Sequence, residues 1–162
     1  MMLKNELEQF LQTLNKELYK FTYSLLPDDL QVSQIIIDSI TVLLLERREL
    51  VETLELCEND TKKENTLFSI KLFLYKRIYE LIQKRSDQLS GSIEYHPDFS
   101  EYHGLDLLEK TVLYFKSKTN FEFEDLTYIL SENKTTVFQA LANGRNNLAT
   151  RAGITSPNNL GQ

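Results

Sequence analysis

Hydrophobic residues recur every three or four positions along most of the chain, and this period predicts helices. The first run covers residues 3–26, and its apolar positions lie on one face of an amphipathic helix. These positions are Leu3, Leu7, Phe10, Leu11, Leu14, Leu18, Phe21 and Leu25. Pro27, in the stretch LPDDL, predicts the end of this helix, and Asp28 or Asp29 is a suitable cap for the next one.

Two more helices are predicted before residue 87. One covers residues 30–56, with a solvated tail from Glu46 to Glu55, and the polar stretch CENDTKKEN interrupts the pattern after it. The other covers residues 66–84. The core-facing positions expected in these two helices are Ile35, Ile36, Ile40, Leu43 and Leu44, followed by Leu67, Ile70, Leu72, Leu74, Ile78, Leu81 and Ile82. Residues 1–86 are therefore predicted to form a three-helix unit.

The helical period lapses over residues 87–104, where serine, glycine, proline and acidic residues gather, so this segment is predicted to be a linker. Residues 105–155 are then predicted to form a second domain with three short helices, LDLLEKTVLYFKS, FEDLTYILS and TTVFQALANGRNNLATR. Thr119 or Asn120 is the expected cap of the second helix, and Thr135 with Thr136 that of the third. Because about four residues, SENK, join the last two helices, the pattern is that of a helix-turn-helix.

The core of this second domain is expected to come from one apolar set. Its members are Leu107, Leu108, Val112, Leu113, Phe115, Phe121, Leu126, Ile129, Leu130, Val137, Leu141 and Leu148. The chain is thus predicted to be all-α, with two small helical domains of which the C-terminal one is a helix-turn-helix. The five glycines and three prolines are few for this length, which also favours helix.

Charge and composition narrow the range of functions. The net charge of -6 argues against nucleic-acid binding by bulk electrostatics, so such binding would require a local basic patch. Cys57 is the only cysteine, which suits a reducing cytosol, and we expect a cytoplasmic protein. The start MMLKNELEQF lacks the apolar segment of a signal peptide, and the most apolar window, IIIDSITVLLL, is too short for a membrane span.

Residues with catalytic or metal-binding chemistry are sparse. His96 and His103 lie seven positions apart in the predicted linker, with Asp98 and Glu101 between them. This spacing would permit a metal site, although such a loop is far more often plain polar surface. The sequence shows no Ser-His-Asp order, no glycine-rich phosphate loop and no paired carboxylates in an apolar setting. We therefore expect no enzymatic activity, no cofactor and no bound metal.

The order of these features resembles that of an extracytoplasmic-function (ECF) sigma factor of bacterial RNA polymerase, as a divergent member of the sigma-70 family. LYKFTYSLLPD lies in the first helical unit, and FEFEDLTYILSENKTTVFQALANGRNNLA closes the second. Within residues 121–148, the aromatic before an acidic pair, the Leu-x-x-Ile-Leu of one helix, the Thr-Val opening of the next and the closing Arg-x-x-Leu match the family pattern. The resemblance covers nearly the whole chain.

The resemblance implies a transcription-initiation function. In that family the N-terminal domain binds the polymerase clamp and melts the promoter near position minus ten, and the C-terminal domain binds the minus-thirty-five element. The aligned polymerase-binding positions are Ser33, Gln34, Ile37 and Asp38. The aligned DNA-binding positions are Lys76, Arg77, Lys84 and Arg85 in the first domain and Lys134, Thr135, Thr136, Gln139, Asn143 and Arg145 in the second. The implied partners are RNA polymerase core, promoter DNA and an anti-sigma factor, with no membrane partner.

Several positions depart from the family pattern. Phe138, Ala140 and Ala142 stand where basic residues are usual, and residues 105–162 carry six acidic and six basic side chains. Losing phosphate contacts weakens DNA binding steeply at physiological salt, although Gln139 and Asn143 remain suited to adenine edges. In the first domain Phe73 replaces the usual tryptophan. Phe73 is equally consistent with a core residue, and the neighbouring basic cluster with an ordinary solvated face.

Three hypotheses follow. The first is a working, divergent ECF sigma factor that binds polymerase core and promoter DNA. The second is a degenerate sigma-like protein that binds an anti-sigma factor or polymerase through the acidic, apolar-rich residues 30–56 and does not select promoters by itself. The low content of basic residues favours the second, whereas the two-domain layout and Arg145 permit the first. The first remains the main interpretation, because the resemblance is to that family. The third, ranked below both, is a helix-turn-helix regulator that dimerises through its first three helices.

Overall fold

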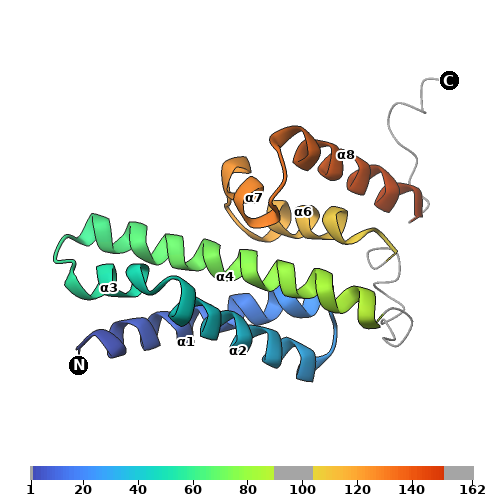
Figure 1. The fold of residues 1–162 in the computed structure, drawn as a ribbon. Helices are drawn as coiled ribbons and strands as arrows, with labels where there is room; N and C mark the ends of the chain where they lie inside the picture. The colour runs from blue at the N-terminus through green and yellow to red at the C-terminus, as the bar shows by residue number, and fades with distance from the viewer. Residues whose placement is uncertain (1, 90–103, 152–162) are drawn as a thin grey trace. The chain divides into compact units, whose positions relative to one another are not determined.

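The computed structural model describes residues 2–89 and 104–151, and every regular element in these ranges is a helix (Figure 1). The helices are α1 (Met2–Leu25), α2 (Asp29–Glu46), α3 (Arg48–Leu56), α4 (Asp60–Leu89), α6 (Leu107–Lys118), α7 (Phe123–Leu130) and α8 (Lys134–Arg151). The chain divides into two compact units, Met1–Gln88 and Leu89–Gln162. The predicted all-α fold is confirmed. Most of the segment expected to be a linker lies outside the described residues, so that assignment stays a prediction.

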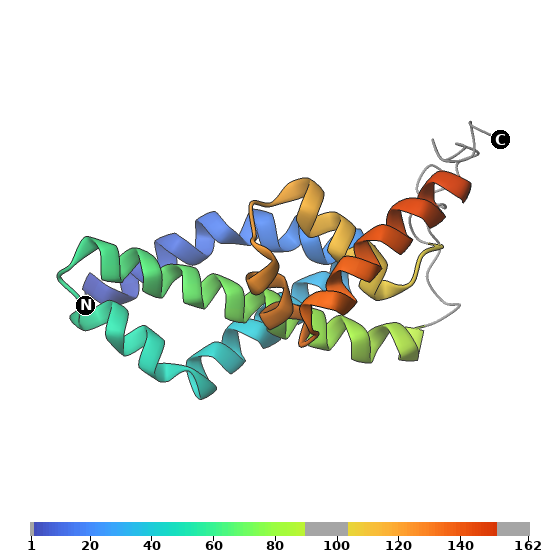
Figure 2. The ribbon, with the colours of Figure 1, turned by 90° about the horizontal axis from the view of Figure 1, so that it is seen from above.

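The N-terminal unit consists of α1 to α4, which run alongside one another (Figure 2). Its interior is apolar, and the side chains of Leu18, Phe21, Ile35, Leu43, Ile70, Leu74 and Ile78 are almost completely buried. The ring of Phe21 in α1 meets the edge of Tyr75 in α4 at a centroid distance of 5.1 Å. Removing apolar surface from water, at about 25 cal/mol per Å², is the main force that holds these four helices together.

The corner between α1 and α2 forms as the sequence predicts. α1 ends at Leu25, two residues before Pro27, whose ring would clash with a continuing helix. The Asp28 carboxylate then accepts hydrogen bonds from the backbone N–H groups of Leu30, at 3.0 Å, and Gln31, at 3.1 Å. These bonds satisfy two of the free donors at the start of α2, so the expected cap at Asp28 is confirmed.

The prediction of one continuous helix over residues 30–56 is wrong, because the helix breaks at Arg47. Arg47 leaves the helical region with φ −118° and ψ 41°, and α3 begins at the next residue. Its guanidinium lies 5.5 Å from the centre of the Phe73 ring. The bend lets α3 pack against α1 and buries Leu54, which the prediction had placed in a solvated tail. Tertiary packing therefore overrides the local helical period here.

The third predicted helix begins earlier and ends later than expected, since α4 covers Asp60–Leu89 rather than 66–84. Asn59 explains the early start. Its side-chain oxygen accepts a hydrogen bond from the backbone N–H of Lys62 at 3.1 Å, as an N-cap residue does. The charged stretch that follows lies on the outside of the helix, where Lys63 pairs with Glu6 of α1 at 2.9 Å. The N-terminal unit therefore has four helices rather than three.

The C-terminal unit consists of α6, α7 and α8, and α8 packs on both of the others. Nine residues of the predicted core are buried: Val112, Leu113, Phe115, Phe121, Leu126, Ile129, Leu130, Val137 and Leu141. Leu107, Leu108 and Leu148 are only half-buried. Gly144 lets α8 approach α6 closely, because a Cβ at this position would lie 3.1 Å from Leu113 Cδ1 and 3.3 Å from Glu109 Cβ.

The caps expected in the C-terminal unit are wrong. Thr119 ends α6 rather than starting α7. α7 instead starts with a capping box, in which the side chains of Glu122 and Asp125 each accept a hydrogen bond from the other residue's backbone N–H. α8 is capped by Asn133, whose side-chain oxygen accepts the backbone N–H of Thr136 at 2.8 Å, and not by the threonine pair. Acids and asparagine thus perform the capping that was assigned to threonines.

Candidate interaction surfaces

The outward side of α2 carries an apolar stripe. Leu30 is 84% exposed and Ile37 57%, and Leu44 and Leu45 are also exposed, so the prediction that Leu44 faces the core is wrong. Positions 30, 37 and 44 are separated by about two helical turns each, so these side chains lie in one row. We call Leu30, Ile37, Leu44 and Leu45 the α2 stripe. Of the residues aligned with polymerase binding, Ser33 and Gln34 are exposed and lie on the same side of the helix as Ile37.

The residues around this stripe are strongly acidic. Residues 28–60 contain nine acidic side chains and only two arginines. The net negative charge of this segment is therefore larger than that of the whole chain, which is -6. Both arginines are paired: Arg47 with Glu49 at 2.5 Å and Arg48 with Glu52 at 3.3 Å. An exposed apolar row flanked by carboxylates suits a protein partner and repels the phosphates of nucleic acid.

Asp38 joins the α2 surface to α4. Its Oδ1 accepts the side-chain amide of Gln34 at 2.8 Å, and its Oδ2 accepts Nη2 of Arg85 at 3.0 Å. The other terminal nitrogen of Arg85, Nη1, donates to Oε1 of Gln31 at 2.8 Å. The structure therefore brings together Asp38, aligned with polymerase binding, and Arg85, aligned with DNA binding. Sequence reasoning had placed them in separate sites.

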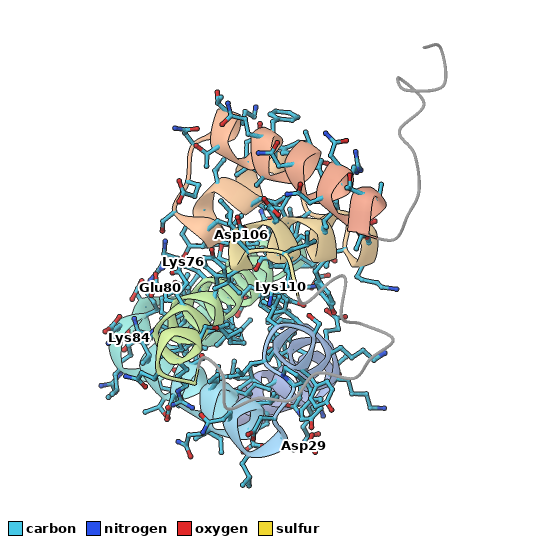
Figure 3. The ribbon with its side chains drawn as sticks, turned by 90° about the vertical axis from the view of Figure 1, so that its right-hand side faces the viewer. Asp29, Lys76, Glu80, Lys84, Asp106 and Lys110 are labelled. Carbon is cyan, nitrogen blue, oxygen red and sulfur yellow. The ribbon has the colours of Figure 1, made fainter. Side chains whose placement is uncertain are left out.

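The basic cluster predicted on α4 is largely neutralised by acids of the same unit. Nη1 of Arg77 lies 3.0 Å from Glu80, and Nζ of Lys76 lies 3.8 Å from it. Arg85 pairs with Asp38, and within the described part of the chain Lys84 alone of the four forms no ion pair. Lys76, Glu80 and Lys84 lie along one side of α4 (Figure 3). Cations already bound to carboxylates contribute little to phosphate binding, because those pairs must first be broken.

Phe73 is a buried residue rather than an exposed stacking platform. Only 8% of its surface is accessible, and the guanidinium of Arg47 covers its ring. Of the two interpretations open from the sequence, the structure supports the core role for this side chain. A base could stack on Phe73 only after Arg47 had moved.

The turn between α7 and α8 has the geometry of a helix-turn-helix. Ser131 adopts a left-handed conformation, with φ 54° and ψ 41°, and reverses the chain. α8 then presents Thr135, Gln139, Asn143 and Arg145 to solvent, while Thr136 is half-buried and its backbone N–H serves the Asn133 cap. The residues predicted to read bases are therefore accessible. Among the described side chains of α8, however, Arg145 is the only exposed cation without an ion pair.

Lys134, the first residue of α8, is paired with Glu124 of α7. Its Nζ lies 2.7 Å from Oε1 of Glu124. This hydrogen bond, together with one from the Glu124 backbone, holds the pKa of the Glu124 carboxyl below its ordinary value. The pair places a carboxylate beside the cation predicted to meet a DNA phosphate.

A feature that sequence reasoning missed is an aromatic contact beside α8. The rings of Phe123 and Phe138 stack with centroids 4.0 Å apart, and Nζ of Lys116 lies 4.5 Å from the centre of Phe123. Phe138 remains 49% exposed. Phe138 had been noted only as the loss of a basic residue, although its spacing from Val137 and Leu141 on the helix already placed it outside the core.

The structure brings together no group of three or more metal-binding side chains among the described residues. His96 and His103, the only histidines, lie outside those residues together with Asp98 and Glu101. None of the described helices has a long enough apolar stretch to cross a membrane.

Comparison with known proteins identifies the fold. No protein-family model and no curated protein sequence matches the chain. Among solved structures, the chain is similar to the sigma factor RpoE from Bartonella quintana, determined in a co-crystal with the anti-sigma factor NepR. The identity is 16%, the TM-score is 0.61, and the match covers 93% of this chain and 99% of the other. The protein therefore has a sigma-factor-like fold.

Proposed function

We propose that the protein is an ECF-type, sigma-factor-like transcription initiation protein that binds RNA polymerase core through the outer side of α2. The observation that carries this proposal is the α2 stripe, an exposed apolar row on a chain whose fold is that of a sigma factor. Ile37 lies at the centre of this row, with Ser33, Gln34 and Asp38 close to it on α2, and Asp38 is held in place by Arg85. A protein of this function has no catalytic site and acts where polymerase is, in the cytoplasm.

Promoter contact in this proposal is weak and depends on α8. Gln139 and Asn143 carry amides that suit adenine edges in the major groove, and Arg145 supplies one phosphate or guanine contact. Lys134 contributes only after it leaves Glu124. Because base contacts need phosphate contacts to fix their register, α8 alone gives little affinity for duplex DNA.

A second function is favoured by the ion pairs on α4. With Arg77 and Arg85 both paired to carboxylates, α4 has little free charge for a melted promoter strand. The protein would then bind polymerase or an anti-sigma factor without selecting promoters. The similar sigma factor from Bartonella quintana is itself bound to an anti-sigma factor in its crystal structure, which supports a partner of that class.

One set of measurements separates the two functions. The purified chain is mixed with bacterial RNA polymerase core, and binding is measured by biolayer interferometry, followed by run-off transcription from promoter templates. Duplex DNA binding is measured separately from 50 to 200 mM salt. Core binding with promoter-dependent transcripts supports the initiation factor, and core binding without DNA affinity at low salt supports the second function. A chain that does not bind core would overturn the proposal.

A further inference from the structure

The outer side of α1 carries two lysines and two tyrosines that alternate. Tyr19, Lys20 and Tyr23 follow Lys16 by three, four and seven residues, so the four side chains lie on one face of the helix. Both lysines are exposed, Tyr23 is 43% exposed, and Tyr19 is half-buried. We call these four residues the α1 stripe. No function was assigned to it from the sequence.

The charges of the α1 stripe differ from those of the basic cluster on α4, where three of the four cations are paired with carboxylates. Neither Lys16 nor Lys20 forms an ion pair with any other described residue. The acid next to them in sequence, Glu17, lies 3.1 Å from Nζ of Lys71 and is thereby partly neutralised. Two cations four residues apart, with no ion-pair partner among the residues that the structure describes, are available to a polyanion.

The tyrosines of the α1 stripe are arranged as parallel rings. The rings of Tyr19 and Tyr23 lie 6.0 Å apart between centroids with an interplanar angle of 11°. The Tyr19 hydroxyl hydrogen-bonds to the carboxylate of Asp29 at the start of α2, which orients its ring. A fixed ring beside a more exposed one offers a flat surface for an aromatic ligand.

We propose that the α1 stripe binds single-stranded nucleic acid. An unpaired base stacks on Tyr23, with Tyr19 behind it, and the backbone phosphates on either side meet Lys16 and Lys20. Stacking requires an exposed base face, which a duplex conceals, so single strands are favoured over duplexes. Every base has such a face, and the α1 stripe has no side-chain amide or guanidinium to read base edges. Binding is therefore independent of sequence.

This site is separate from the residues that carry the proposed function. It shares no residue with the α2 stripe, with the basic cluster on α4 or with α8. The binding of a single strand to the free protein therefore does not depend on whether the protein binds polymerase, and each proposal can fail while the other holds.

The test uses the full chain and a fluorescein-labelled 12-nucleotide oligo-dT, with fluorescence anisotropy measured at low salt. A 12-base-pair duplex and oligo-U serve as comparison ligands, and the oligo-U arm distinguishes RNA from DNA. We expect oligo-dT to bind more tightly than the duplex. Tyr23→Leu should weaken binding by about tenfold or more, because one stacked base is lost. The matched control is Tyr128→Leu, which removes a similarly exposed tyrosine from α7 and should leave the affinity unchanged.

The lysines are tested through the salt dependence of binding. The double variant Lys16→Gln/Lys20→Gln should lower the slope of log K against log salt by about 1.4, since each lost phosphate contact on a single strand removes about 0.7. Its control, Lys62→Gln/Lys118→Gln, removes two other exposed lysines that have no ion pair among the described residues and should retain the slope. No oligo-dT binding at low salt, or equal losses in test and control variants, would overturn the proposal.

Discussion

The outer faces of α2 and α8 differ in the chemistry they expose. α2 exposes aliphatic side chains, with Leu30 and Ile37 prominent, inside an acidic segment. α8 exposes amides, Gln139 and Asn143, next to Arg145, a cation with no ion pair among the described residues. The first combination suits a protein surface, because apolar area is removed from water when a partner covers it. The second can read bases but has few means to hold a phosphate backbone.

Under the proposed function, α2 would be a protein-binding face and α8 a DNA-binding face with few free cations. α2 needs only exposed apolar residues on a rigid helix, and its sequence provides them in a regular row. α8 needs several free cations, and the structure leaves it few because Glu124 takes up Lys134. The predictions below test whether the faces differ as much in binding as they do in chemistry.

Ile37→Glu should have the largest effect. If the α2 stripe is covered by polymerase core, this change places an unpaired carboxylate in an apolar contact, and core binding should weaken by about a hundredfold or more. The fold should be retained, because the side chain is exposed. Biolayer interferometry against immobilised core measures the binding, and circular dichroism checks the helix content. Leu56→Glu, at an 83% exposed position of α3, is the control and should bind normally. Equal weakening in both variants would mean that added charge, not the α2 stripe, is responsible.

Arg85→Gln should lower the free energy of unfolding by about 1–2 kcal/mol, between the values typical of exposed and buried ion pairs. Arg85 is only 21% exposed, and its loss removes a hydrogen bond from each of Asp38 and Gln31 and the ion pair of Asp38. Urea unfolding followed by circular dichroism measures the change. Lys84→Gln, one residue earlier and without an ion pair in the described residues, should be neutral. If the two variants are equally stable, Arg85 does not anchor α4 to the α2 surface.

Asn133→Ala should loosen α8 by about 1 kcal/mol, because it removes the N-cap hydrogen bond to Thr136. Amide hydrogen exchange, followed by mass spectrometry, should show protection of the first turn of α8 reduced by about fivefold, while α2 is unchanged. Asn133→Asp retains a side-chain acceptor and should preserve the protection. An Asp variant as labile as the Ala variant would show that the cap is not what orders this turn.

The apolar period was enough to predict helices, their approximate places and most of both cores. Phe21, Ile35 and Ile70 face inward as their spacing requires, and so do Leu126 and Val137. The period could not reveal the break at Arg47, because residues 43–54 have good helix propensity throughout. The break exists because Leu54 is buried where α3 packs against α1, a contact between residues far apart in the chain.

The candidate sites were less predictable, because charge counts say nothing about partners. Arg77 and Arg85 appear in the sequence as a basic cluster, and only the structure shows that Glu80 and Asp38 bind them. Asp38 lies 47 residues before Arg85, so no local pattern connects the two. The capping role of Asn133 was, in contrast, visible in the local sequence. Asparagine is a preferred N-cap residue, and its side-chain oxygen accepts the backbone N–H three residues later, here that of Thr136.

The smallest expected effect tests α8 directly. Glu124→Gln removes the carboxylate that pairs with Lys134 and should free this lysine for a phosphate. Affinity for duplex DNA at low salt should rise a few-fold, and the slope of log K against log salt should steepen by about 0.9, the contribution of one further phosphate contact. Fluorescence anisotropy with a labelled duplex over 50 to 200 mM salt measures both. A flat response would mean that α8 does not meet phosphates even when its cation is free.

Glu132→Gln is the control that separates a freed lysine from a general loss of negative charge. Glu132 lies in the turn between α7 and α8 and forms no ion pair in the described part of the chain, so its replacement changes the net charge equally without releasing Lys134.

The pH dependence of stability gives a second check. Because the pKa of Glu124 is lowered in the folded protein, the stability from its pair with Lys134 is present above the ordinary value of 4.5 and is lost as the pH falls through the lowered value. The Glu124→Gln variant should therefore not show this loss of stability at low pH, whereas the Glu132→Gln variant should still show it. If the ion pair of Lys134 limits DNA binding by α8, only Glu124→Gln should gain affinity for DNA.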